Sequence, residues 1–411
     1  MVGIVMLTFF VISFLTNIIG PLVPDIITGF NLNLTLVAIL PFAFFIAYGV
    51  MSIPAGMLIE KYSEKKMMVV SFVVATGGSL MLAFFPNYLS AIGSLFLIGC
   101  GMAILQVVIN PLLRTAGGEE NYAFYSIMAQ LIFGLASFLS PLVYSGIVSN
   151  LQKDPLPGGL YKTLAGLVPH SLPWISMYWL FAVVCLLMII VLVLSRFPKV
   201  ELSSEEKAGA LSIYAMLFRK RVVILFFIAM LCYVGTEQGV ANWISQFLAS
   251  YHNYDAQTTG AKTVAYFWGL MTAGGVLGLL FVKLLDSRYV LIIFTTLALI
   301  SLSIALFGSG NASLIAFPMV GFFASVMYPI IFSLALNSVA EHHGSFSGIL
   351  VTGIIGGAIV PLIIGWLGDR LGLRGGMCFI YLTMGFILSI GFWAKPIISN
   401  KTIQLGKKQK E

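Results

Sequence analysis

The chain has 411 residues, of which 59% are hydrophobic and only 9% are charged. A soluble domain carries about 25% charged residues, and no soluble fold could bury this much apolar surface. The composition therefore excludes a soluble protein and predicts an all-α polytopic membrane protein. The formal net charge of +7 is explained by basic cytoplasmic loops, described below, so it gives no reason to expect a nucleic-acid partner.

Windows of about 20 apolar residues, long enough to cross a bilayer as a helix, occur twelve times along the chain. The predicted spans are residues 4–25, 35–58, 67–86, 90–113, 122–148, 174–196, 221–248, 261–284, 289–308, 312–337, 346–368 and 376–395. In the first span, Gly20-Pro21 and Pro24 predict a helix break near the outer surface. We expect Asp25, at the outer end of that span, to be a solvated helix terminus; the alternative is a buried site.

The basic residues set the orientation of these spans. If the N-terminus is cytoplasmic, 17 of the 22 Lys and Arg residues fall on the cytoplasmic side and five fall outside. This asymmetry predicts that both termini are cytoplasmic. We expect an integral protein of the plasma membrane, which is the inner membrane in a bacterium, with the lipid bilayer as its main partner.

One charged segment, between Arg196 and Arg221, divides the spans into two sets of six. The predicted organisation is an N-terminal half (1–197), a cytoplasmic linker (198–220), a C-terminal half (221–396) and a cytoplasmic tail (397–411). The halves echo one another, because residues 134–146 resemble 356–368 and residues 109–113 resemble 327–331. Two repeated halves indicate a transporter whose site lies near the middle of the membrane between them.

Glu237 is the only charged residue that falls well inside a predicted span. It lies roughly 24 Å of helix rise into the apolar run that follows Arg219-Lys220-Arg221. A carboxylate at that depth costs on the order of 2.5–3.5 kcal/mol, so it should face protein or water. We predict that Glu237 couples transport to a cation; alternatively, it is a structural acid hydrogen-bonded between helices.

Amide and aromatic side chains inside the spans are candidate substrate ligands, because sugar hydroxyls need paired donors and acceptors. The candidates are Asn17, Gln106, Asn110, Gln130, Gln238, Asn242, Gln246, Trp268 and Tyr328. Gln106 and Asn110 are four residues apart and share a helical face. The alternatives are interhelical hydrogen bonding for the amides and simple packing for the two aromatic residues.

The seventh span presents a geometric problem. On an unbroken helix, Gln238, Asn242 and Gln246 form one stripe, and Glu237 lies about 100° away from it. Both sets can face one site only if the helix is kinked or unwound, and Gly235 or Gly239 could allow that. We therefore expect a broken helix near one of these glycines.

Five short strings, in the right order, resemble the fucose:proton symporter family of the major facilitator superfamily. They are S-I-P-A-G (52–56), Q-V-V-I-N-P (106–111), Y-V-G-T-E-Q-G-V-A-N-W (233–243), Y-P-I-I-F-S-L (328–334) and I-I-G-G-A-I-V-P (354–361). The chain is more similar to the glucose/galactose transporter branch, which carries Gln and Glu where Gln106 and Glu237 stand. The resemblance implies the twelve-helix major facilitator fold in two pseudo-symmetric halves, and cation-coupled sugar transport.

Two positions depart from the family pattern. The family usually has an Asn-Asp pair late in span one, where this chain has Ile19-Gly20, and an Asn-Ser pair in span five, where it has Phe133-Gly134. Both changes remove groups that would face a sugar or carry a proton. One carboxylate, Glu237, must then serve alone, and on this ground Na⁺ is slightly favoured over H⁺ as the coupling ion.

The turn after the second span resembles the loop motif of the same superfamily. It contains Gly56, Glu60, Lys61, Lys65 and Lys66, with Glu for the usual Asp. We expect a tight inner turn whose charges pair with neighbouring helix ends. Its role would be to hold and gate the two halves.

The predicted function is therefore cation-coupled uptake of a monosaccharide, such as glucose, galactose or a deoxyhexose, by alternating access. Two alternatives stay open: an exporter of amphipathic or drug-like compounds, and a transporter-like sensor. The sequence contains no nucleophile–base pair, metal-ligand spacing or phosphate-binding loop, so we expect neither an enzyme nor a bound metal or cofactor other than the coupling ion, Na⁺ or H⁺. A monomer is sufficient for this mechanism.

Overall fold

The computed structural model describes residues 1–118, 122–195, 197, 211–339 and 343–396. Most of the predicted linker and the whole predicted tail lie outside these residues, so the domain boundaries stay predictions. Within the described part, eleven helices are long and apolar enough to cross a membrane, and the shorter apolar helix Phe379–Trp393 follows them. The prediction of an all-α polytopic membrane protein is confirmed.

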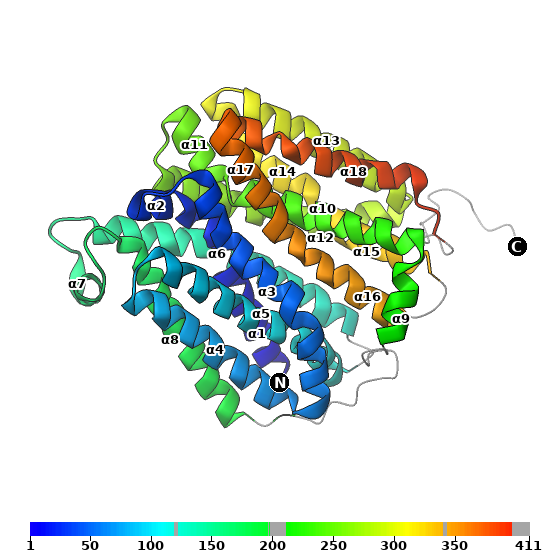
Figure 1. The fold of residues 1–411 in the computed structure, drawn as a ribbon, viewed down its shortest axis with the longest axis horizontal. Coiled ribbons are helices and arrows are strands. Elements are labelled where there is room, and N and C mark those ends of the chain that lie inside the picture. The colour runs from blue at the N-terminus through cyan, green and yellow to red at the C-terminus, as the bar shows by residue number, and fades with distance from the viewer. Residues whose placement is uncertain (119–121, 196, 198–210, 340–342, 397–411) are drawn as a thin grey trace, which may run out of the picture.

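The helices follow one another in two sets (Figure 1). The N-terminal half contains α1 (Val2–Thr16), α2 (Ile19–Phe30), α3 (Leu34–Lys61), α4 (Glu64–Phe84), α5 (Tyr88–Gly117), α6 (Tyr122–Leu151), α7 (Gly158–Leu167), η2 (Pro173–Ile175) and α8 (Ser176–Leu194). The C-terminal half contains α9 (Leu211–Phe218), α10 (Arg221–Ala241), α11 (Ile244–His252), η3 (Ala256–Gly260), α12 (Ala261–Leu284), α13 (Ser287–Phe307), α14 (Gly310–Ala324), α15 (Met327–Leu336), α16 (His343–Thr352), η4 (Gly353–Ile355), α17 (Gly356–Met377) and α18 (Phe379–Trp393).

Local capping explains where several of these helices begin. Side chains of residues just before the first turn accept a hydrogen bond from a backbone N–H in that turn. These capping residues are Asn33, Ser63, Asn87, Asp286 and Ser309. At Asp286, hydrogen bonds from the Arg288 side chain also hold the pKa of the carboxyl below its usual range. Each cap lies between two apolar runs, so the polar residues mark the ends of the bundle.

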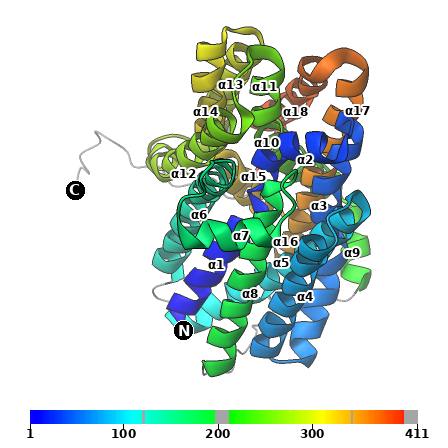
Figure 2. The same cartoon turned by 90° about the vertical axis from the view of Figure 1, so that its left-hand side faces the viewer.

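The bundle has two ends, which we call the α7 end and the linker end. The linker end carries the N-terminus and α9, and the α7 end carries α7 and the α2–α3 turn (Figures 1 and 2). The two halves pack against each other along three seams: α3 against α17, α6 against α12, and α2 against α11. A functional site between the halves is therefore bordered by α1, α3 and α6 on one side and α10, α12 and α17 on the other.

Two spans break at positions that differ from those predicted. The first span breaks at Asn17-Ile18, and α2 continues through Pro24. This break lies one turn before Pro21. Because proline has no N–H, the carbonyl four residues before it has no helical hydrogen-bond donor. The predicted break at Gly20-Pro21 is therefore about one turn later in the sequence than the observed break.

The seventh span breaks at Asn242-Trp243, between α10 and α11, and not near the two glycines. Gly235 and Gly239 instead allow α17 to approach closely. A Cβ at Gly235 would lie 2.3 Å from Val360 Cγ2, and one at Gly239 would lie 2.9 Å from Ile364 Cδ1. The glycines in this helix serve interhelical packing, so the prediction of a kink there was wrong.

Candidate functional site

Glu237 lies on α10 with hydrogen-bond donors on both carboxylate oxygens. The Tyr233 hydroxyl, one helical turn earlier, donates to Oε2 at 2.6 Å, and Gln238 Nε2 donates to Oε1 at 3.2 Å. Tyr233 and Gln238 are buried, whereas Glu237 keeps part of its surface exposed. Both carboxylate oxygens are therefore held by neutral donors.

Two aromatic residues extend this group toward α15. The ring of Tyr328 lies 5.7 Å from that of Tyr233 and 5.8 Å from that of Phe332, measured between centroids. Tyr328, proposed from the sequence as a substrate ligand, thus packs against Tyr233, the residue that donates to Glu237. α15 begins after a third helix break, at Ser325-Val326.

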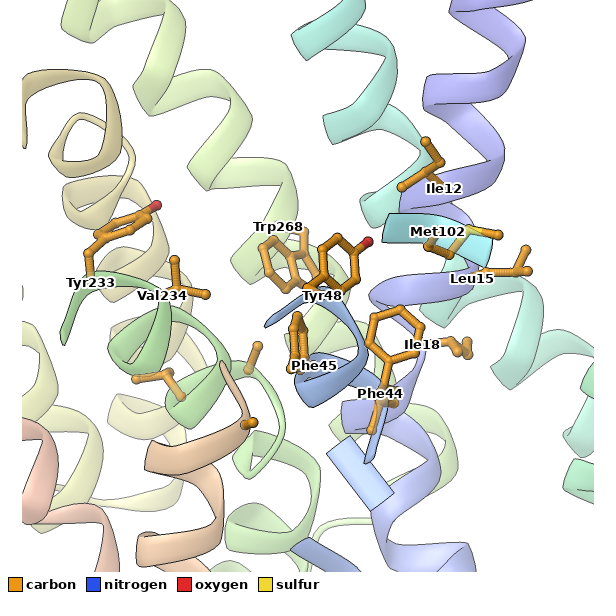
Figure 3. Close-up of a cluster of buried hydrophobic side chains, with 14 of the residues drawn as sticks. Ile12, Leu15, Ile18, Phe44, Phe45, Tyr48, Met102, Tyr233, Val234 and Trp268 are labelled. Carbon is orange, nitrogen blue, oxygen red and sulfur yellow. The ribbon is translucent and has the colours of Figure 1, made fainter. Parts of the chain in front are cut away.

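The pair Glu237–Gln238 also borders the N-terminal half. A Cβ at Gly357 of α17 would lie 3.2 Å from Gln238 Cγ and 3.0 Å from the Phe45 ring of α3. The ring centroid of Phe45 in turn lies 6.2 Å from that of Tyr48. Figure 3 shows these two rings, with Trp268 of α12, in the region between α10 and α1. Aromatic side chains from both halves therefore lie near the Glu237–Gln238 pair.

The breaks in the first and seventh spans face one another. A Cβ at Gly20 would lie 2.3 Å from the Ala241 carbonyl oxygen and 3.1 Å from Asn242 Cα. A side chain at position 20 would clash with the backbone of the other half in this arrangement, so the close approach of the two breaks depends on glycine there. The second departure is similar, because a Cβ at Gly134 would meet Thr272 Oγ1 at 1.9 Å.

Asn17 and Asn242 end the two helices that stop at these breaks. Asn17 Nδ2 donates to Ser137 Oγ of α6 at 2.8 Å and to Ser13 Oγ at 3.4 Å. Asn242 Nδ2 and Trp268 Nε1 are buried donors without a hydrogen-bond partner among the described residues. Buried polar groups are normally paired, so these two donors are unusual in having no partner within the described chain in this conformation.

The structure separates the remaining candidate ligands. Gln246 lies beyond the break, and its Nε2 donates to Ser250 within α11 at 2.9 Å. Gln106 on α5 is half-buried, and Gln130 on α6 is exposed. The side chain of Asn110 lies outside the described part of the chain. The geometry therefore groups Glu237, Gln238 and Tyr328, and it places Gln246 with α11.

The turn after α3 follows the predicted pattern in part. Lys65 Nζ donates to the carbonyl oxygens of Val193 and Ser195, both at 2.8 Å, at the C-terminal end of α8. A cation there also complements the negative end of the helix dipole. A Cβ at Gly56 would meet nothing within 4 Å. The side chains of Glu60 and Lys61 lie outside the described part of the structure.

Asp25 was predicted to be a solvated terminus, and this is wrong. Its side chain is 9% exposed and accepts hydrogen bonds from Tyr144 at 2.5 Å and from Gln257 at 2.8 Å. Gln257 belongs to the other half, so burial comes from long-range packing that local sequence cannot report. For Tyr233, by contrast, a signal was present: it precedes Glu237 by four residues, on the same helical face.

Comparison with known proteins identifies the family. The Major Facilitator Superfamily model matches residues 5–354. The glucose/galactose transporter of Brucella abortus is 31% identical over 376 residues, which cover 90% of this chain and 87% of that protein. The L-fucose-proton symporter of Escherichia coli is 26% identical over 381 residues, covering 89% of this chain and 86% of that one.

Solved structures agree on the fold. The transporter FucP in its outward conformation gives a TM-score of 0.67 at 22% identity, covering 96% of this chain and 98% of that one. A bacterial homologue of the human lysosomal transporter Spinster, inward-facing and occupied, gives 0.78 at 12% identity and covers 96% of both chains. Together with the matched helices and the two packed halves, these similarities show that the chain belongs to the major facilitator superfamily.

Proposed function

We propose that this protein is a secondary active transporter that takes up a monosaccharide together with a cation. The observation that carries the proposal is Glu237, a partly exposed carboxylate held by two neutral donors between two packed six-helix halves. In a transporter, a site at this place is reached from one side of the membrane and then from the other as the halves rock. The names of the relatives, transporters of glucose, galactose and fucose, support a sugar as the substrate.

The side chains around Glu237 suit a small polyhydroxylated ligand. Asn242 Nδ2 and Trp268 Nε1 are buried donors that a sugar hydroxyl could accept from. The rings of Tyr48, Trp268 and Tyr328 offer flat surfaces for the apolar face of a sugar ring. Glu237 would carry the coupling ion, because binding H⁺ or Na⁺ neutralises a carboxylate that is costly to keep charged within the membrane.

We place the linker end in the cytoplasm, on the basis of the basic residues, and the α7 end outside. With this orientation the two halves meet at the outer end of the bundle, so this conformation is closed toward the outside. One chain contains both halves of the site, so a monomer is sufficient for transport.

Counterflow tests the substrate. Proteoliposomes preloaded with unlabelled hexose should concentrate labelled glucose, galactose or fucose transiently, and protein-free liposomes should not. Accumulation under an imposed Na⁺ gradient or an imposed H⁺ gradient then identifies the coupling ion. Absence of counterflow for every hexose in the panel would contradict sugar transport.

The alternative is export of amphipathic compounds, and one observation favours it. Phe45, Tyr48 and Trp268 make the region between the halves strongly aromatic (Figure 3). An exporter would lower the accumulation of a hydrophobic dye in cells that express it, and it would show no hexose counterflow. The sensor has no comparable support in the described residues.

A further inference from the structure

Asp369, near the C-terminal end of α17, bonds to the start of α3 in the other half. Its Oδ1 accepts the Leu34 N–H at 2.9 Å, and its Oδ2 accepts the Thr35 N–H at 2.9 Å and the Thr35 hydroxyl. The first N–H groups of a helix have no partner within that helix. A carboxylate from one half therefore completes the first turn of a helix in the other half.

Asp25 makes a second bond across the halves at the same end of the bundle. It is buried on α2, and Gln257 of η3 donates to its Oδ1 across the seam at 2.8 Å. Its other oxygen accepts from Tyr144, which belongs to the same half. The carboxylate is thus anchored within one half and bonded to the other.

The backbones of the two halves also approach each other closely at two points. A Cβ at Gly365 of α17 would lie 2.5 Å from the Leu34 carbonyl oxygen, and one at Gly20 would lie 2.3 Å from that of Ala241. Helices this close cannot separate by side-chain rotation alone. Rocking of the halves must therefore break the Asp25–Gln257 and Asp369–α3 bonds together.

We propose that Asp25 and Asp369 form a two-carboxylate latch that holds the α7 end closed during the transport cycle. The inference rests on the proposed alternating access, because a latch has a role only if this end opens. Hydrogen bonds to charged groups are among the stronger ones. The Asp25 bond is buried and dominates, whereas Asp369 is exposed to solvent, so its bonds contribute less. Both residues position the halves and touch no substrate.

Distances between spin labels at the α7 end test the latch. Cysteines at Leu89 and Phe307, exposed positions on opposite halves, would carry the labels in a background whose four native cysteines are replaced. Double electron–electron resonance in nanodiscs then gives the ratio of closed to open molecules without any substrate. Wild type should be mainly closed. Gln257→Leu should lower the ratio about tenfold and Asp369→Asn about threefold, the effects expected for a buried and an exposed bond.

Two control variants make the same chemical changes away from the seam. Asp286→Asn alters an aspartate that caps α13 within its own half, at the linker end, and Gln152→Leu alters an exposed glutamine. Both should keep the wild-type distances. If Gln257→Leu does not fold, Gln257→Glu, which sets two carboxylates against each other, should open the α7 end further.

Equal distance distributions in wild type, latch variants and controls would overturn the latch, as would a wild type that is mainly open. The measurement needs no sugar, so the two proposals fail separately. If the wild type shows no hexose counterflow but the latch variants open, only the proposed sugar substrate is refuted. Counterflow with unchanged distances would refute only the latch.

Discussion

Gly20→Ala is expected to favour opening of the α7 end, because the added methyl group has no room in the closed arrangement. Its Cβ would lie 2.3 Å from the Ala241 carbonyl oxygen and 3.1 Å from the carbonyl carbon and from Asn242 Cα. These neighbours are backbone atoms, so no side-chain rotation relieves the contact. The oxygen must move by about 1 Å to reach ordinary van der Waals distance.

Overpacking of this kind costs about 1–3 kcal/mol. The contact joins α2 to the α10–α11 break across the two halves, so it is relieved when the halves separate. The ratio of closed to open molecules should therefore fall about 5-fold to 150-fold, since 1.4 kcal/mol corresponds to a factor of about ten. Alanine also favours a helix over glycine by about 1 kcal/mol, so the protein should still fold.

The assay is the distance distribution between labels at Leu89 and Phe307. Gly77→Ala and Gly146→Ala are matched controls, because a Cβ at either helical glycine would meet nothing within 4 Å. Both controls should keep the wild-type distribution. A Gly20→Ala protein with the same distribution as these controls would refute the close approach of the two breaks.

Three further substitutions have direct consequences. Tyr233→Phe removes the hydroxyl that donates to Glu237. The apparent affinity for the coupling ion, measured from the ion dependence of uptake, should therefore change about tenfold or more. An unchanged ion dependence would contradict a role of Glu237 in coupling. Trp268→Phe removes a buried donor, and the KM for hexose should rise about fivefold, whereas an unchanged KM would place Trp268 outside the site. Lys65→Met removes two hydrogen bonds to the end of α8 and should lower the free energy of unfolding by about 0.5–1.5 kcal/mol. The control is Lys66→Met, at the exposed neighbouring residue. Equal melting temperatures for the two variants would contradict a role of Lys65 in holding the α3–α4 turn against α8.

The spans could be predicted from the sequence because the hydropathy of a membrane helix is a local property. The position of Glu237 followed from the same property, since a charge inside an apolar run stands out. Its partner Tyr233 follows from helical spacing. The charged linker and the internal repeats indicated two halves and a transporter, and the family resemblance agreed with both.

Other features could not be predicted from the local sequence. Gly235 and Gly239 suggested a kink, but glycine in a membrane helix also permits close packing, and only the position of α17 decides between the two. Asp25 was misjudged because its burial depends on Gln257, which lies 232 residues away. A carboxylate near a span end has the same local pattern whether it meets water or another half of the protein.

The central claim is that Glu237 couples sugar movement to a cation gradient, and Glu237→Gln tests it most directly. Glutamine has nearly the same shape and keeps an acceptor for Tyr233, but it can neither bind a proton nor ligate Na⁺ through a charge. Wild type, Glu237→Gln and the control Glu64→Gln would be compared for hexose exchange and for gradient-driven accumulation. We predict that Glu237→Gln exchanges hexose but does not accumulate it, while the control does both. Accumulation by Glu237→Gln at the wild-type level would contradict the account.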